Sequence, residues 1–95
     1  MSTETVKSAN TMAGGWTDFH NLTDADLAVF NKALKGLDGV NYTPEQVATQ
    51  VVAGTNYKFK CKAVPVVLDP VEYTAIVEIF ESLDGKVSIT QIIKE

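Results

Sequence analysis

The side chains of this sequence that could take part in nucleophilic or metal chemistry are few. It holds one cysteine, Cys61, and one histidine, His20, at no spacing that suggests a catalytic pair. Cys61 shares an alternating apolar face with Phe59 and Ala63, which predicts a buried and inert thiol. One cysteine and one histidine also fall short of the ligand set of a metal site. We therefore expect neither a cysteine nucleophile nor a bound metal.

The carboxylates do not suggest a catalytic acid and base either. They are spread over the predicted helix start, the turns and the solvent-facing strand positions: Asp24, Asp26, Asp38, Glu45, Asp69, Glu72, Glu78, Glu81 and Asp84. General acid–base catalysis needs two such groups within reach of one substrate. The sequence also lacks a glycine-rich phosphate loop. We predict that the protein is not an enzyme and uses no cofactor.

The length and charge of the chain limit the classes of molecule that it is expected to bind. The chain has 95 residues, which fits a single domain, and a net charge of −4 at pH 7. An acidic balance argues against a surface that binds phosphate backbones, so no nucleic-acid partner is expected. No stretch approaches the roughly 20 apolar residues of a membrane span, so no membrane partner is expected.

The predicted compartment follows from the cysteine content and the first residues. A single cysteine allows no intramolecular disulfide, which fits a reducing compartment. Residues 1–10 are polar and lack the apolar run of a signal peptide. These features predict a cytoplasmic protein, and a secreted form processed at its start stays open as an alternative.

One helix is predicted from residue 24 to residue 36. Thr23 is a suitable N-cap, and Asp26, three residues later, gives a weaker version of the capping box. Gly36 and Gly39 offer stop signals. Apolar residues recur at spacings of three and four and form one stripe that should face the core: Leu27, Phe30, Leu34 and Leu37.

The period of the apolar residues changes to two after Pro44, which predicts strands. The alternation is cleanest from Tyr57, where an apolar face opposes a basic one: Tyr57, Phe59, Cys61 and Ala63 against Lys58, Lys60 and Lys62. A basic row of this kind is usually a solvated face, so we do not interpret it as a binding patch. A further strand is predicted near 73–81, and its Glu78 should lie across from the lysine row. A short strand is predicted over 16–20.

The last strand is predicted over 86–93, after the hairpin signal Asp84-Gly85. Its alternation places four residues on one side: Val87, Ile89, Gln91 and Ile93. One helix followed by consecutive strands with short links indicates an antiparallel meander covered by the helix, a two-layer α+β domain. We expect a flexible N-terminal tail over residues 1–11, which are Ser/Thr-rich, and a single domain over residues 12–95.

One segment matches a family motif. It consists of Gln50, Val51, Val52, Ala53 and Gly54, and it has the commonest form of the cystatin pentapeptide, Gln-Val-Val-Ala-Gly. It continues as Thr55-Asn56-Tyr57, as intracellular stefin-type cystatins do.

Two other segments agree with the family in order and spacing. The pair Gly14-Gly15 resembles its N-terminal glycine, and Leu83-Asp84-Gly85 lies where it has its second hairpin. Over residues 12–95 the chain therefore resembles a stefin-like, type 1 member of the cystatin superfamily.

The resemblance implies a fold and a function. The fold is one α-helix packed across a curved antiparallel β-sheet of four to five strands. The function is reversible, competitive inhibition of papain-like, cathepsin-type cysteine proteases by a monomer whose N-terminal trunk and two hairpins enter the active-site cleft as a wedge. The implied protease-binding residues are Met12, Ala13, Gly14 and Gly15 in the trunk, Gln50, Val51, Val52, Ala53 and Gly54 in the first hairpin, and Leu83, Asp84 and Gly85 in the second.

Two positions depart from the family pattern. Asp84 stands where many cystatins carry proline, and Ala13 is small for a subsite that usually takes a bulky apolar residue. Three alternatives stay open at this point. The chain could be a binding scaffold of the same fold with no protease target, a small enzyme with a deep pocket on a related fold, or a dimer formed by exchange across the first hairpin.

Overall fold

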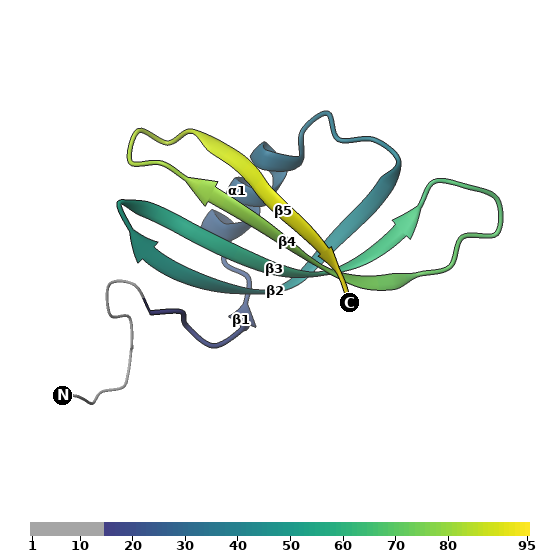
Figure 1. The fold of residues 1–95 in the computed structure, drawn as a ribbon, viewed down its shortest axis with the longest axis horizontal. Coiled ribbons are helices and arrows are strands. Elements are labelled where there is room, and N and C mark those ends of the chain that lie inside the picture. The colour runs from purple at the N-terminus through teal and green to yellow at the C-terminus, as the bar shows by residue number, and fades with distance from the viewer. Residues whose placement is uncertain (1–14) are drawn as a thin grey trace.

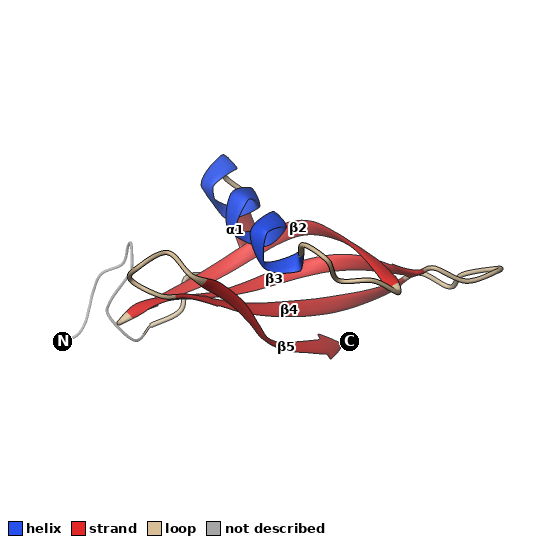
Figure 2. Cartoon of the chain, turned by 90° about the horizontal axis from the view of Figure 1, so that it is seen from above, coloured by secondary structure: helices blue, strands red, loops and turns tan. Residues whose placement is uncertain are grey.

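The computed structural model describes residues 15–95, and the predicted tail over residues 1–11 lies outside them. The elements are β1 (His20–Asn21), α1 (Asp24–Leu34), β2 (Val40–Val52), β3 (Gly54–Pro65), β4 (Tyr73–Glu81) and β5 (Val87–Lys94). The strands form one antiparallel sheet in the order β1-β2-β3-β4-β5 (Figure 1). The helix lies on one face of this sheet (Figure 2). The predicted α+β class, with one helix on an antiparallel sheet, is confirmed.

The helix begins where the sequence predicts and ends two residues early. Thr23 Oγ1 accepts a hydrogen bond from the Asp26 amide at 3.2 Å, and the Asp26 carboxylate accepts one from the Thr23 amide at 3.0 Å. This capping box satisfies amides that the first helical turn leaves without partners. The helix ends at Leu34 because Gly36 adopts a φ of +85°, in the left-handed region.

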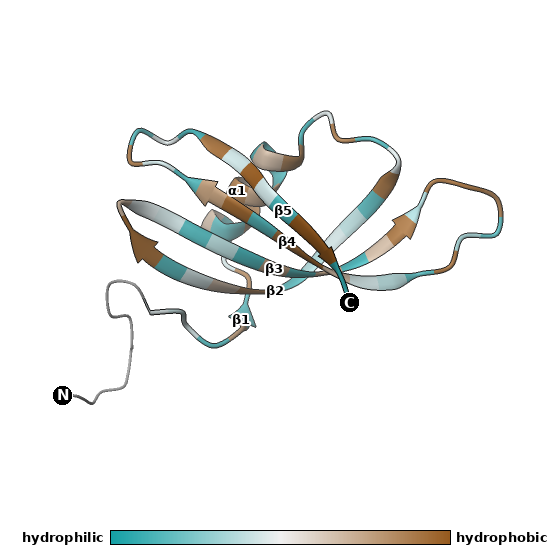
Figure 3. Cartoon of the chain, viewed as in Figure 1, coloured by the Kyte–Doolittle hydropathy of each residue, from teal (hydrophilic) through white to brown (hydrophobic). Residues whose placement is uncertain are grey.

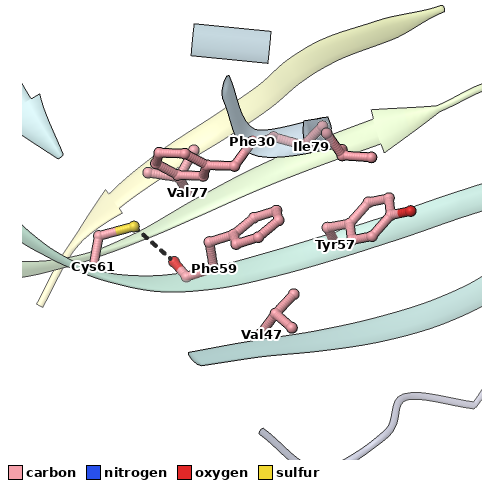
Figure 4. Packing of buried hydrophobic residues seen from close by; sticks show 8 residues of the cluster. Phe30, Val47, Tyr57, Phe59, Cys61, Val77 and Ile79 are labelled. Carbon is pink, nitrogen blue, oxygen red and sulfur yellow. Dashed lines mark hydrogen bonds between the residues drawn. The ribbon is translucent and has the colours of Figure 1, made fainter. Parts of the chain in front are cut away.

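The early helix end changes the buried stripe. Leu37 lies beyond the helix and is 42% exposed, so its predicted place on the stripe is wrong. The buried helical residues are Val29 and Phe30. The Phe30 ring meets the Phe59 ring edge to face, with 5.0 Å between centroids (Figure 4).

The first long strand starts earlier than its pattern suggests. β2 already begins at Val40 and contains Pro44, whereas the period of two was expected after that proline. The register shifts between Pro44 and Gln46, so Glu45 is an extra residue against β3. A bulge tolerates proline because the ladder loses a hydrogen bond there in any case. At the other margin of β2, the strand predicted over 16–20 is reduced to a bridge from Trp16 to Gln50 and the two residues of β1.

The face of β3 that packs against the helix is the one predicted. It carries Tyr57, Phe59, Cys61 and Ala63, and each of them is buried. Val47 of β2 and Val77 and Ile79 of β4 complete this core cluster with α1 (Figure 4). Lys58 pairs with Glu78 across the opposite face, as predicted.

The predicted alternation of β5 is wrong because of a second bulge. Ile89 pairs with Ile79 but Gln91 pairs with Glu78, which leaves Thr90 as an extra residue in β5. Ile92 is therefore aligned with Val77, whose face meets the helix, and Ile93 with Ile76 on the opposite face. That opposite face, which we call the outer face, also holds buried Ala48 and Ile76, so it is less polar than the lysine row suggests. Figure 3 shows the hydropathy of the residues along each strand, with brown apolar segments in β4 and β5.

Candidate functional site

One end of the sheet brings two of the predicted segments together. The last paired row that spans all the strands from β2 to β5 consists of Val51, Thr55, Glu81 and Val87. Beyond this row, the β2–β3 hairpin and the β4–β5 hairpin turn next to each other (Figure 1). The bridge from Trp16 to Gln50 brings the chain that follows Gly15 to the same end. We call residues 15–17, 50–55 and 82–86 the hairpin end; Met12, Ala13 and Gly14 lie outside the described residues.

The first hairpin presents a narrow apolar tip. Val52 pairs with Gly54, so Ala53 is the single residue between the two strands. Val51 is 46% exposed and Val52 is 41% exposed. Both side chains are β-branched, which restricts their rotamers and keeps the tip stiff. Behind the tip, the Gln50 side-chain oxygen accepts a hydrogen bond from Asn56 Nδ2 at 2.8 Å.

Gly54 lies under this tip and is buried. Its φ is +120°, and a Cβ atom there would lie 2.5 Å from the carbonyl oxygen of Glu81 and 2.7 Å from the Phe80 ring. The missing side chain therefore lets the first hairpin approach the end of β4. A glycine at a hairpin tip can let backbone approach backbone. In the structure, the backbone that it approaches belongs to the protein's own sheet.

Asp84 and Gly85 shape the second hairpin, and Leu83 is exposed at its tip. Hydrogen bonds from Ser82 N to Lys86 O at 2.8 Å and from Gly85 N to Ser82 O at 2.9 Å close the turn. The Asp84 carboxylate accepts hydrogen bonds from the Ser82 hydroxyl and the Lys86 amide. The bond from Ser82 is the main cause of a lowered pKa for Asp84. Leu83 is 84% exposed, so it is the apolar group that this turn presents.

Two contacts that the sequence did not reveal hold the second hairpin in place. Lys32 Nζ, on the last turn of α1, donates a hydrogen bond to the carbonyl oxygen of Gly85 at 2.9 Å. The Tyr57 hydroxyl of β3 donates one to Glu81 Oε1 at 3.1 Å. Both pairs are far apart in sequence, and no local pattern connects them. Together they tie the hairpin to the helix and to the core.

The Tyr57 contact predicts a loss of stability at high pH. Burial, and then the hydrogen bond to Glu81, raise the pKa of Tyr57 to about 12 from its ordinary value of 10.0. Above pH 10 the unfolded chain releases this proton while the folded chain keeps it, so the free energy of unfolding falls until about pH 12. We expect this fall to be shallower in Tyr57→Phe. Urea unfolding of both proteins between pH 9 and 12 measures the difference, and parallel curves would contradict it.

Neither the one cysteine nor the one histidine of the sequence belongs to the hairpin end. Cys61 is fully buried, its Sγ lies 3.4 Å from the carbonyl oxygen of Phe59, and burial raises its pKa to about 12. His20 is exposed, with Nδ1 3.0 Å from the carbonyl oxygen of Asn21. Among residues 15–95, no group of three or more histidine, cysteine or acidic side chains could hold a metal ion. The same residues contain no helix long and apolar enough to cross a membrane.

A hollow of about 240 Å³ lies elsewhere, between the end of α1 and the start of β2. Its lining combines apolar, amide, phenol and amine groups: Phe30, Asn31, Leu34, Lys35, Leu37, Val40, Asn41 and Tyr42. None of these is a carboxylate, a thiol or an imidazole. The ionisable groups in this lining are the Lys35 amine and the Tyr42 phenol.

Comparison with protein-family models and with curated proteins gave no match. The likeness to cystatins therefore stays a resemblance of the residues quoted from the sequence. The structure itself shows that residues 15, 50–54 and 83–85 lie at one end of the sheet. That arrangement offers exposed apolar contact area from Val51, Val52 and Leu83. It suits the hairpin end for binding another molecule.

Proposed function

We propose that this chain is a stefin-like cystatin, a monomeric, reversible and competitive inhibitor of papain-like cysteine proteases. The observation that carries the proposal is the pair of neighbouring hairpin tips with exposed Val51, Val52 and Leu83. In this function the tips enter the active-site cleft of the protease and block access of the substrate. The resemblance of residues 50–54 to the cystatin pentapeptide supports this class of target.

The shape and composition of the tips suit a cleft. A ligand for a narrow groove gains affinity from apolar area that it buries without desolvating charge. The first tip has two valines and one alanine, and the second has an exposed leucine. The second tip also carries Asp84, whose carboxylate already accepts hydrogen bonds within the turn and lies 3.8 Å from Lys86 Nζ. This supports a turn-forming role for Asp84 at the position of the family's proline.

The rigidity of the hairpin end also favours tight binding. Association costs conformational entropy in every segment that must be ordered, so segments ordered in advance bind more tightly. The Lys32–Gly85 and Tyr57–Glu81 hydrogen bonds restrain the second hairpin, and the close packing of Gly54 restrains the first. Inhibition then requires no covalent step, because the inhibitor only occupies the cleft.

A titration of papain with the purified monomer tests the proposal. Hydrolysis of a fluorogenic peptide should fall with increasing inhibitor, the inhibition should be relieved by higher substrate concentration, and activity should return on dilution. The same titration against a cathepsin-type enzyme extends the result within the proposed target class. Full activity of both enzymes at micromolar inhibitor would contradict the proposal and favour a binding scaffold with another partner.

A further inference from the structure

The chain that leads into the first β-strand is fixed to the sheet at two adjacent residues. Trp16 forms a bridge with Gln50, and the Thr17 amide donates a hydrogen bond to the carbonyl oxygen of Thr49 at 2.9 Å. The Thr49 amide donates in return to the Thr17 hydroxyl at 3.0 Å. This attachment is separate from β1, which pairs with Val47 and Gln46 further along β2.

The indole of Trp16 has a second partner on the outer face. Lys58 Nζ lies 4.1 Å from the ring centroid, within the range of a cation–π contact. Lys58 pairs with Ala48 of β2 and with Glu78 of β4, so its side chain starts near the middle of the sheet and reaches toward the margin where Trp16 lies. Lys60 repeats the arrangement with Phe19, at 5.2 Å from the centroid.

We infer that Trp16 and Lys58 form a clamp that fixes the described chain to the sheet at Trp16 and so sets the point from which the proposed trunk starts. The positioning role rests on the proposed function, because the proposed trunk, residues 12–15, directly precedes Trp16 in the sequence. Trp16 and Lys58 are then positioning residues: they act on the protease through the chain that they hold. The lysine row therefore has a role beyond solvation, which the sequence pattern did not suggest.

Lys62 supplies a matched control. It lies on the same strand and the same face as Lys58, and it is paired with the Glu45 carboxylate at 3.8 Å instead of with a ring. Lys58→Met removes the ammonium and keeps the length of the side chain, Lys58→Arg keeps a cation, and Lys62→Met removes the same charge without affecting Trp16.

The clamp can be measured in the full chain without a protease. Trp16 is the only tryptophan in the sequence, so the decay of fluorescence anisotropy reports its ring alone. We expect Lys58→Met to increase the amplitude of the fast decay, and Lys58→Arg and Lys62→Met to leave it as in the wild type. An unchanged decay in Lys58→Met would overturn the clamp.

The positioning role requires inhibition constants for papain in two backgrounds. In the wild-type background, Lys58→Met should weaken inhibition about two- to fivefold, the size of one exposed cation–π contact, and Lys58→Arg should restore it. In a full-length background with Met12→Gly and Ala13→Gly, which has no trunk side chains to place, Lys58→Met should have no effect. An equal loss in both backgrounds would show that Lys58 acts elsewhere. A wild-type protein that leaves papain active would overturn the proposed function and the positioning role together, while the anisotropy still decides whether the clamp exists.

Discussion

Val52→Asp is expected to weaken inhibition of papain by about a hundredfold or more, because a buried charge without a partner costs about 3–5 kcal/mol. Val52 is the last residue of β2, it is 41% exposed, and it lies at the tip of the first hairpin. In the free protein an aspartate there stays in water, so the fold should tolerate it. In the proposed complex the carboxylate would be forced into an apolar cleft. Inhibition constants for the two proteins measure the effect.

Val67→Asp is the matched control for this experiment. Val67 lies in the loop between β3 and β4, at the opposite end of the sheet, and it is 62% exposed (Figure 1). The substitution has the same chemistry and the same change in net charge, so it should leave the inhibition constant unchanged. Thermal unfolding of both variants shows that they are folded. If the two variants inhibit equally, the hairpin end is not the surface that meets the protease.

The second large effect concerns stability: Gly54→Ala should destabilise the fold by roughly 2–5 kcal/mol. A φ of +120° strains any residue with a Cβ atom, and the Cβ would overlap the Glu81 carbonyl oxygen and the Phe80 ring. Left-handed backbone costs about 1–2 kcal/mol for a non-glycine residue, and overpacking adds about 1–3 kcal/mol. For a domain of this size the melting temperature should fall by roughly 10–30 °C.

Gly36→Ala separates the two causes. Gly36 also has a positive φ, of +85°, but nothing lies within 4 Å of the Cβ that alanine would add. Its cost should be the backbone strain alone, about 1–2 kcal/mol. Urea unfolding of the two variants and the wild type gives both values. A Gly54→Ala protein as stable as Gly36→Ala would contradict the close packing between the first hairpin and β4.

Local rules were enough to predict the helix start and the inward face of β3. The capping box at Thr23 and the alternation from Tyr57 depend on neighbours in sequence, and the structure confirms both. The bulge that leaves Thr90 unpaired in β5 was missed because the residues around it include no glycine or proline to mark it. One extra residue turns every later side chain of the strand to the other face, so the alternation predicted after Thr90 was wrong.

The hairpin end was predicted in part. The first-hairpin segment could be named from a motif, and the other two segments from their order and spacing along the chain. The hairpin signal at Asp84-Gly85 placed the second turn correctly. Residue spacing could not show that Gly54 is buried, that Lys32 reaches the second hairpin or that Lys58 lies over Trp16. Each of these depends on contacts between elements that are distant in sequence, and such contacts are set by the packing of the whole domain.

The close packing at Gly54 also bears on how such a protein can diversify. The tip residues Val51, Val52 and Leu83 are exposed, so mutations there can retune the choice of partner at little cost to folding. Position 54 does not share this freedom, because any larger residue would push apart the two hairpins that it joins. Among descendants of this protein, glycine at position 54 should therefore be retained because the fold requires it. The tip residues should change whenever the partner changes.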